Sequence, residues 1–300
     1  MNRSNFIRNS STILAALALF SNKTLAQLLQ DPAWKIKMLN DNTGVFSEKG
    51  GTILFTITKE GIVVVDSQFP DSSQHLIDEL KNKSALPFQL LVNTHHHGDH
   101  TSGNIAYKGM VQHVVAHENS KINQEKVAKE KKNENQQLYP DKTFNDTWCE
   151  KIGKEKICLH YFGAGHTNGD IFVHLKKANI VHVGDLVFNR RHPYIDSSAG
   201  ANIANWIKVL DKATTTFNNK TIFVCGHAGD GFDIIITKND IKAFSNYLDK
   251  TLQFVTAEIK AGKSKDDILK ATIIPGATEW TGKGIERPLT AAYEELILTY

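Results

Sequence analysis

The segment that most constrains the fold of this chain is Asn93–Asn104, which reads NTHHHGDHTSGN. Four side chains of metal-ligand type stand within six residues there: His95, His97, Asp99 and His100. The apolar run Phe88–Val92 precedes the segment and indicates a buried strand that stops where the histidines begin. Functional loops at the carboxyl ends of strands are typical of α/β proteins. The pattern therefore predicts a metal site on a loop that a buried strand holds in place.

Spacing within this loop divides its side chains into two groups. His95 and His97 are two residues apart and can point to the same side, so that Asp99 and His100 face a second position. His96 lies between two candidate ligands and should point the other way, in a supporting or structural role. An alternative is a surface loop or a tag-like run of histidines, which the internal position after an apolar strand disfavours.

A strand followed by a residue of ligand type recurs along the chain. It does so at four further positions: Asp66, His166, Asp185 and His227. Short strands are expected at 179–183 and 221–225, so that the last two residues follow strand ends. Taken singly, each position has an ordinary reading as a surface or core residue. The glycine-rich turn 163–170, which contains His166, is not a phosphate-binding loop, because no helical pattern follows it.

The other patterns predict a mixture of strands and helices without an internal repeat or a linker. Further strands are expected at 52–58, 62–65, 111–116 and 171–175, with a hairpin at 147–162 that turns at Gly153-Lys154. Helices are expected at 72–83, 118–137, 203–217, 239–261, 264–272 and 288–298. We expect one domain over 27–300, in which the helices from about residue 238 take part.

The first 26 residues have the order of an export signal. Arg3 and Arg8 precede the apolar stretch 13–20, and a small-residue cleavage site ends at Ala26. An ordinary N-terminal helix is the alternative. The export route, general secretion or twin-arginine, stays open because Ser4 stands in the place of the second arginine. The mature protein is expected to begin at Gln27 and to be soluble in a bacterial periplasm.

Removal of this signal makes the chain electrically neutral. Three of the 35 basic residues and none of the 32 acidic ones lie in it, which leaves 32 of each. A neutral chain gives no electrostatic reason to expect a nucleic-acid partner. No later apolar run reaches the roughly 18 residues that a membrane span needs. The sequence sets no oligomeric state.

The ordered series of motifs resembles the metallo-β-lactamase superfamily. Its motifs run from an Asp at a strand end through H-x-H-x-D-H to His, Asp and His at three later strand ends. The resemblance covers about Thr52 to Ala228, and H-x-H-x-D-H is its most specific element. It implies an α/β (α+β) fold, a four-layer αβ/βα sandwich of two mixed β-sheets flanked by helices. The site would lie at one edge, between the sheets.

The resemblance also implies a centre with two metal ions. One ion would be held by His95, His97 and His166, the second by Asp99, His100 and His227, with Asp185 bridging both. Imidazole and carboxylate ligands without a thiolate suit zinc, with manganese or iron possible. Asp66 would hydrogen-bond the ligand loop and fix its orientation.

The implied activity is hydrolysis by an exported dinuclear zinc enzyme. Two zinc ions lower the pKa of a shared water to about 7, and the bridging hydroxide would attack an ester, thioester, lactone or β-lactam. Asp99 would orient that nucleophile as well as bind metal. One alternative is a phosphodiesterase of the same fold, which needs a positive pocket. A non-catalytic periplasmic zinc-binding protein is another, but it needs no bridging carboxylate.

Departures from relatives narrow the resemblance. The B1 β-lactamases carry a Cys in place of Asp185, and the B3 enzymes lack a bridging Asp, so the ligand set is similar to that of glyoxalase II, lactonases and phosphodiesterases. The C-terminal basic residues with which glyoxalase II holds glutathione have no clear counterpart here. Three residues close after Asp185 would bind an anionic group of a small-molecule substrate, or are ordinary loop charges: Arg190, Arg191 and His192.

Two of the three cysteines are placed to form a disulfide. If Gly153-Lys154 is a two-residue hairpin turn, counting outward puts Cys149 opposite Cys158 at a pair without hydrogen bonds. The Cα atoms of such a pair lie about 4.5 Å apart, a span that a disulfide bridges in an oxidising compartment. A shift of the turn by one residue would put the two thiols on opposite faces. Cys225 has no partner and should be a buried thiol.

Overall fold

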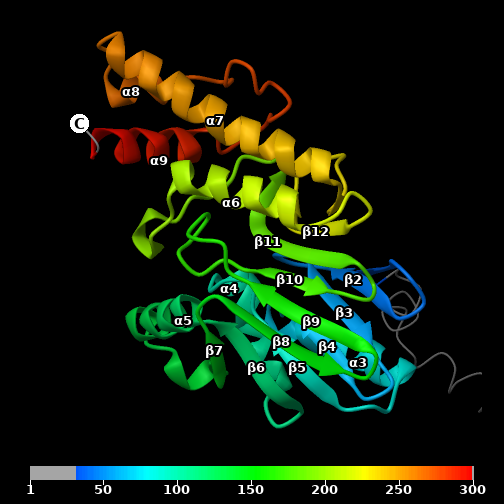
Figure 1. The fold of residues 1–300 in the computed structure, drawn as a ribbon. Coiled ribbons are helices and arrows are strands. Elements are labelled where there is room, and N and C mark those ends of the chain that lie inside the picture. Colours follow the sequence, from blue (N-terminus) through cyan, green and yellow to red (C-terminus); the bar gives the residue numbers. More distant parts are fainter. Residues whose placement is uncertain (1–31, 299–300) are drawn as a thin grey trace, which may run out of the picture. The chain divides into compact units, whose positions relative to one another are not determined.

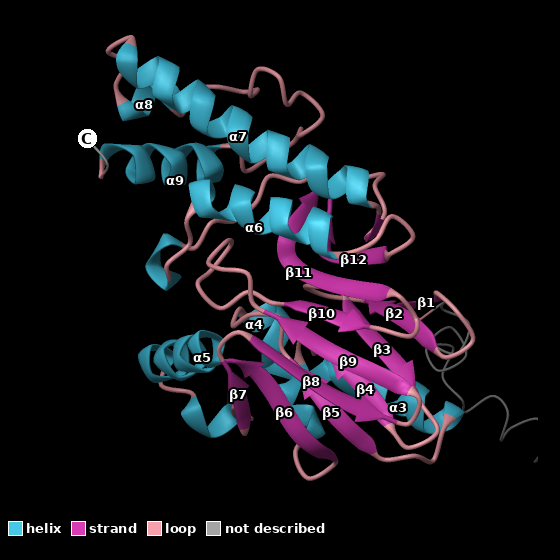
Figure 2. Cartoon of the chain, viewed as in Figure 1, coloured by secondary structure: helices cyan, strands magenta, loops and turns pink. Residues whose placement is uncertain are grey.

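Two mixed β-sheets face each other at the centre of the structure, and helices cover their outer faces (Figures 1 and 2). The computed structural model describes residues 32–298. The predicted export signal at 1–26 therefore lies outside the described residues. Contacts group the chain from Ile36 onward into one compact unit. Across residues 32–298, every helix is too short or too polar to cross a bilayer.

The first sheet has seven strands in sequential order, β1 to β7. Strands β2, β3 and β4 pair antiparallel, whereas β4, β5, β6 and β7 run parallel and are joined through helices. The strands are β1 (Lys35–Met38), β2 (Thr43–Ser47), β3 (Ile53–Ile57), β4 (Ile62–Val65), β5 (Phe88–Val92), β6 (Val111–His117) and β7 (Lys142–Phe144). The connecting helices are α3 (Pro70–Lys83), α4 (Gly98–Thr101), the 3₁₀ helix η1 (Ser102–Tyr107) and α5 (Glu118–Lys131), and a 3₁₀ helix η2 (Glu134–Gln136) follows α5.

The second sheet has six strands and continues the chain. Only β11 and β12 run parallel in it, and α6 joins them; the other neighbours are antiparallel. The strands are β8 (Thr147–Ile152), β9 (Glu155–His160), β10 (Phe172–Leu175), β11 (Ile180–Asn189), β12 (Ile222–Ala228) and β13 (Ile235–Ile236). The helices of this half are the 3₁₀ helix η3 (Ser197–Ala199), α6 (Ile203–Thr216), α7 (Lys238–Lys260), α8 (Lys265–Ile268) and α9 (Glu286–Ile297).

Two separate apolar cores hold these layers together. The core between the sheets joins side chains of both, among them Val63, Val65, Leu90, Val92, Leu159 and Val173. The second core lies between the second sheet and the C-terminal helices and contains Phe172, Val181, Trp206, Phe244 and Tyr247. Strands β4 and β5 are buried on both faces, which explains their continuous apolar sequences. Each such buried side chain stabilises the fold by about 1.5–3 kcal/mol.

The outer face of the first sheet is covered by α3 and α5, which lie beside it in Figure 1. Helix α3 buries Leu76, Ile77 and Leu80, the three apolar residues whose spacing predicts it. The order of layers is thus helices, sheet, sheet, helices. The predicted sandwich of two mixed sheets flanked by helices is confirmed.

Several element boundaries differ from the sequence predictions in the second half of the chain. Asp185 and His227 lie inside β11 and β12 instead of following shorter strands. Gly184 adopts φ +51°, and the pairing of β11 with β12 shifts register before and after this residue. Strand β11 therefore contains a bulge at Gly184 and continues to Asn189. Such a bulge re-aims the next side chain without ending the strand.

Some helices are shorter than predicted, and four strands were not expected. Helix α5 ends at Lys131, because Lys132 adopts φ +55° and closes it, so it does not reach residue 137. The segment predicted as a helix at 264–272 contains only the short α8. The unexpected strands are β1, β2, β7 and β13. Strands β1, β7 and β13 lie at sheet edges, and their two to four residues carry too little alternation to show a pattern.

The predicted disulfide between Cys149 and Cys158 is confirmed. Ile152 pairs with Glu155 and Cys149 with Cys158, so the turn has the expected register. The two Cα atoms are 4.2 Å apart, and the sulfurs are bonded. Cys225 is a free, buried cysteine, also as predicted.

Thiol titration tests this pairing in solution. Protein recovered from an oxidising compartment should show one free thiol when it is denatured without reductant, and three after reduction, because only Cys225 lacks a partner. The variant Cys225→Ala is the control and should then show none without reductant. Three titratable thiols in unreduced, denatured wild-type protein would contradict the bridge.

Candidate metal centre

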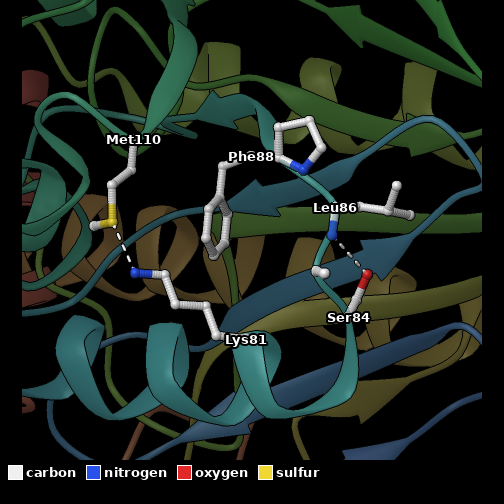
Figure 3. Close-up of a pocket in the computed structure, with 7 residues that line it drawn as sticks. Lys81, Ser84, Leu86, Phe88 and Met110 are labelled. Atoms are coloured by element: carbon white, nitrogen blue, oxygen red, sulfur yellow. Dashed lines mark hydrogen bonds between the residues drawn. The ribbon is translucent and has the colours of Figure 1, made fainter.

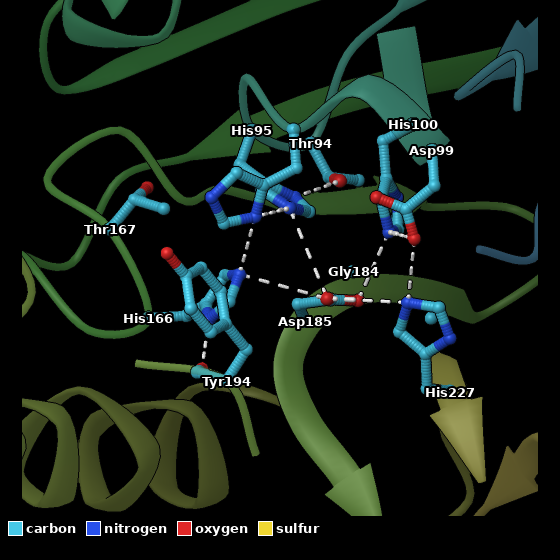
Figure 4. A network of polar contacts seen from close by, with 12 residues as sticks. Thr94, His95, Asp99, His100, His166, Thr167, Gly184, Asp185, Tyr194 and His227 are labelled. Atoms are coloured by element: carbon cyan, nitrogen blue, oxygen red, sulfur yellow. Dashed lines mark hydrogen bonds and ion pairs between the residues drawn. The ribbon is translucent and has the colours of Figure 1, made fainter. Parts of the chain in front are cut away.

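The candidate ligands come together at one edge of the sandwich, where loops of both sheets meet. The first sheet contributes the loop after β5 and the short helix α4, which carry His95, His97, Asp99 and His100. The second sheet contributes His166 from the β9–β10 loop, Asp185 from β11 and His227 from β12. All seven side chains lie in two adjoining clusters. Figure 4 shows Asp185 between them, with His166 and His95 on one side and His227, Asp99 and His100 on the other.

Three imidazole nitrogens converge in the first cluster. His97 Nδ1 lies 3.1 Å from His95 Nε2 and 2.9 Å from His166 Nε2. The far nitrogen of each ring is held by another group: Thr94 Oγ1 at 3.1 Å from His95 Nδ1, Asp196 Oδ2 at 2.8 Å from His97 Nε2, and the Tyr194 carbonyl at 2.7 Å from His166 Nδ1. These contacts leave one nitrogen of each ring directed at a common point, as a metal site requires.

The second cluster pairs two imidazoles with a carboxylate. His227 Nε2 lies 3.1 Å from Asp99 Oδ2, and His100 Nε2 lies 3.8 Å from the same oxygen. His100 is fully buried, whereas Asp99 and His227 are partly exposed. This cluster is therefore the one more open to solvent.

Asp185 contacts both clusters. Its Oδ2 lies 3.6 Å from His166 Nε2 and 3.4 Å from His227 Nε2, and its Oδ1 lies 3.2 Å from His100 Nε2. Close backbone packing fixes the carboxylate there. A Cβ added to Gly226 would lie 2.0 Å from Asp185 Oδ1, and one added to Gly184 would lie 2.5 Å from Thr94 Oγ1. A residue larger than glycine would thus displace the carboxylate or the ligand loop.

Four of the candidate ligands have protonation states that suit cation binding. Burial lowers the pKa of His95 well below its usual value and that of His166 to about 3, so both imidazoles are neutral near pH 7. Burial raises the pKa of Asp185, but the surrounding histidines outweigh it and hold the pKa well below its usual value. Burial also raises the pKa of Asp99, but the contact with His227 and the nearby histidine charges outweigh it and lower the pKa to about 2. Neutral imidazoles beside ionised carboxylates are the forms that bind metals. His100 differs, because burial lowers its pKa but Asp185 and Asp66 outweigh burial and hold the pKa well above its usual value, so that this imidazole must release a proton to bind a cation.

Two buried atoms of the seven candidate ligands lack the hydrogen bonds that burial normally demands. Within the described part of the chain, neither His100 Nε2 nor Asp185 Oδ1 has a hydrogen-bond partner. A buried polar atom without a partner is unfavourable by about 1–3 kcal/mol, and native proteins seldom leave one unexplained. A cation between these two atoms would satisfy both. The donor set, five imidazoles and two carboxylates, fits zinc.

Asp66 lies beneath the second cluster at the end of β4. Its Oδ1 accepts a hydrogen bond from the Thr94 amide at 2.7 Å, and its Oδ2 is 2.8 Å from both Thr94 Oγ1 and His100 Nδ1. The residue is fully buried and adopts φ +65°, a conformation that non-glycine residues hold only under constraint. One carboxylate thus fixes both the start of the ligand loop and the orientation of His100.

Asp196 is a functional candidate that sequence patterns missed. Its Oδ2 lies 2.8 Å from His97 Nε2 and 3.5 Å from His96 Nε2. His96 therefore turns away from Asp185 but joins His97 through Asp196, and these three form a third group that could hold a metal. The sequence offers only a weak signal for Asp196, which is an aspartate of the type that caps helices and stands before Ser197-Ser198. Its carboxylate does cap the 3₁₀ helix η3, where it accepts a hydrogen bond from the Ala199 amide.

A cavity of about 320 Å³ opens over the two clusters. Besides the candidate ligands it is lined by Gly98, Phe188, Arg191, His192, Tyr194 and Arg287. Arg190 is not among them, because its guanidinium pairs with Asp240 at 2.9 Å and Glu279 at 3.1 Å. Sequence patterns gave no signal for Arg287, which reaches the cavity from α9.

Two other cavities lack this chemistry. The one at the end of α3 is lined by Lys81, Ser84, Leu86, Phe88 and Met110, with no carboxylate or imidazole (Figure 3). Its polar contacts join Lys81 Nζ to Met110 Sδ at 3.2 Å and the Leu86 amide to Ser84 Oγ at 3.2 Å (Figure 3). A larger cavity of about 560 Å³ lies among the turns around Asn42, Lys59 and Lys154 and includes none of the candidate ligands.

Comparison with known proteins points to one family. The model of the metallo-beta-lactamase superfamily matches residues 50–227. The metallo-beta-lactamase IND-1 of Chryseobacterium indologenes is 25% identical over 190 residues, which is 61% of this chain and 75% of that protein. A metallo-beta-lactamase type 2 of Bacillus cereus is 25% identical over 207 residues, which is 65% of this chain and 77% of that protein.

Solved structures agree on the fold. A metallo-beta-lactamase from Pontibacter korlensis superposes with a TM-score of 0.61 at 22% identity, covering 72% of this chain and 99% of that one. The metallo-beta-lactamase IND-7 superposes with a TM-score of 0.59 at 20% identity, covering 73% and 100%. The relatives and structures named here are all metallo-beta-lactamases, and the likeness of the ligand set to that of glyoxalase II stays a prediction.

The role of Asp66 can be tested by a neutral replacement of the same shape. Asp66→Asn should weaken metal binding by roughly 10- to 100-fold, because the amide cannot accept from the amide of Thr94, its hydroxyl and His100 together. Competition titration with a chromophoric chelator measures this. Asp78→Asn is the control, since exposed Asp78 lies on α3, hydrogen-bonds Gln74 and is not one of the candidate ligands. Equal affinity in the two variants would show that Asp66 does not support the centre.

Proposed function

Because the chain belongs to the metallo-beta-lactamase superfamily, we propose that it is an exported dinuclear zinc hydrolase acting on an ester, thioester, lactone or β-lactam. The observation that carries this proposal is the position of Asp185 within 4.0 Å of candidate ligands from both clusters. A protein that only stores zinc needs no carboxylate between two sites. The stretch 27–300 serves as one domain of the metallo-β-lactamase fold.

Each of the two clusters would hold one metal ion. His95, His97 and His166 would hold one ion, Asp99, His100 and His227 would hold the other, and Asp185 would contribute to both. Two bound zinc ions supply a water of lowered pKa and positive charge to stabilise a developing oxyanion. Manganese or iron would satisfy the same nitrogen and oxygen ligands.

The chain's own groups orient and enclose the reaction. Asp99 is the candidate catalytic carboxylate, because it is partly exposed, faces the cavity and is ionised near pH 7. Phe188 packs parallel to the His227 ring at 5.7 Å and shields that side of the centre from water. Tyr194 also lines the cavity, with its ring centroid 5.5 Å from that of His97. A small molecule fits this cavity.

Two other functions remain candidates. A phosphodiesterase of the same fold would use the same ligands, and a non-catalytic zinc-binding protein would use them without turnover. Zinc-loaded protein should be assayed with nitrocefin, an acyl lactone, S-lactoylglutathione and bis-p-nitrophenyl phosphate. Hydrolysis of one of the first three supports the proposal. Turnover of the phosphodiester alone supports the first alternative, and tight zinc binding without turnover supports the second.

Metal content and two substitutions test the ligand assignment. Fully active protein should contain about two ions per chain, and chelation should abolish activity. Asp185→Ala should lower kcat by more than the roughly 10- to 100-fold loss that follows removal of a residue outside the ligand set. His96→Ala should stay within that range, since His96 contacts Asp196 and is not one of the proposed ligands. Equal losses in kcat, or full activity with a single ion, would refute the assignment.

Export can be tested by mass spectrometry of the mature chain. Protein from the periplasm should begin at Gln27, because cleavage is expected after Ala26. A lysine at Arg3 and Arg8 is the conservative control, since it keeps the positive charge and should leave general secretion intact. Periplasmic protein that retains Met1 would contradict the signal.

A further inference from the structure

We propose that His182 is a positioning residue, which holds Asp185 between the two clusters because its hydrogen bonds connect the bulge at Gly184 to the first sheet. The inference rests on the proposed function, since it takes Asp185 as a ligand of both ions. It deepens that function by assigning a role to a buried histidine that belongs to neither cluster.

His182 stands in the apolar core between the two sheets. It lies on β11, and its partners on the neighbouring strands are Val173 and Val224, which belong to that core. Val181 and Val183, on either side of it in the sequence, belong to the other core, which packs against the C-terminal helices. The imidazole is fully buried among these side chains. A polar ring in such a place needs a hydrogen bond at each of its nitrogens.

Both ring nitrogens of His182 have a partner in the backbone. Nδ1 lies 2.9 Å from the amide nitrogen of Gly184, and Nε2 lies 2.9 Å from the carbonyl oxygen of Thr52. An amide donates and a carbonyl accepts, so Nδ1 accepts a hydrogen bond and Nε2 carries the hydrogen that is donated. Burial lowers the pKa of His182, which favours the neutral ring that these two bonds require.

The hydrogen bond to Gly184 stabilises the bulge that directs Asp185. His182 accepts from the amide two residues ahead of it, as Asn and Asp side chains do where they shape turns. The other side of the bulge packs against the ligand loop, because a Cβ added to Gly184 would lie 2.5 Å from Thr94 Oγ1. Asp185 follows directly and lies between the two clusters (Figure 4). The direction of this carboxylate therefore depends on how the bulge is held.

Thr52 connects this hydrogen bond to the first sheet. It is buried and stands immediately before β3. Its carbonyl accepts from His182, while its amide at 3.0 Å and its hydroxyl at 3.1 Å both donate to the carbonyl of Gly226, the residue before His227. Loss of the His182 ring would release the bulge from Thr52 but would leave the contacts with Gly226. We therefore expect the effect to fall on Asp185.

A double-substitution cycle tests whether His182 acts through Asp185. His182→Phe removes both hydrogen bonds and should raise the dissociation constant for zinc roughly tenfold, as loss of a residue that supports a ligand does. Asp185→Ala should raise it further, because a ligand is lost. In the Asp185→Ala background, His182→Phe should change the dissociation constant by less than about twofold, since the carboxylate it positions is absent. Competition titration with a chromophoric chelator measures all four proteins.

A conservative substitution should rescue part of the zinc affinity. The amide oxygen of His182→Asn can accept from the Gly184 amide but the side chain is too short to reach Thr52, so the expected loss is about threefold. If His182→Phe does not fold, the same cycle is run with His182→Asn.

The matched control is His174→Phe. His174 is also a buried histidine, on the neighbouring strand β10, and it belongs to neither cluster. Its Nε2 has no hydrogen-bond partner in the part of the chain that the structure describes. This substitution should leave the zinc affinity unchanged.

The outcomes separate this inference from the proposed function. An equal loss of affinity on substitution of His182 with and without the Asp185 carboxylate, or no loss in either background, would show that His182 only packs the core, and would overturn this inference alone. If wild-type protein does not bind zinc, or if Asp185→Ala leaves the affinity unchanged, Asp185 is not a ligand. The ligand assignment and this inference would then fail together.

Discussion

The site depends first on one buried carboxylate, that of Asp66. A charge in an apolar sandwich is unfavourable unless hydrogen bonds satisfy it, and Asp66 accepts them from the Thr94 amide, the Thr94 hydroxyl and the His100 ring. One partner, Thr94, precedes the first candidate ligand of the loop, and the other, His100, is the last. The same contacts that make the burial of Asp66 possible therefore give the loop its shape. Its positive φ shows that the surrounding packing holds the residue in place.

The parts of the site that are local in the sequence could be predicted from it. The loop 93–104 follows a continuous apolar strand, so both its position and the division between His95, His97 and the Asp99-His100 pair could be inferred. Hairpin geometry was local too, which is why the Cys149–Cys158 register was predictable. The location of Asp185 within β11 was not, because a bulge at Gly184 depends on pairing with β12.

Residues that reach the site through long-range packing have no sequence pattern from which their role could be predicted. Asp196 contacts His97 because the segment after β11 folds back over the ligand loop. Arg287 lies on a helix almost two hundred residues after that loop in the sequence, and it still lines the cavity. The three charged residues after Asp185 show the same limit. Their proximity in sequence suggested a shared role, but Arg190 turns toward α7, whereas Arg191 and His192 line the cavity. Side-chain direction in a loop is set by the neighbours it meets.

The position of the candidate metal centre between the two sheets links metal binding to the stability of the fold. Ligands of the candidate centre come from both sheets, so an ion held there would cross-link the two halves of the sandwich at one edge. Metal affinity and resistance to unfolding then become two measures of one equilibrium. Free metal at a hundred times its dissociation constant would add about 2.7 kcal/mol to the free energy of unfolding. When free metal is scarce, the protein would therefore unfold more readily and would also lose activity.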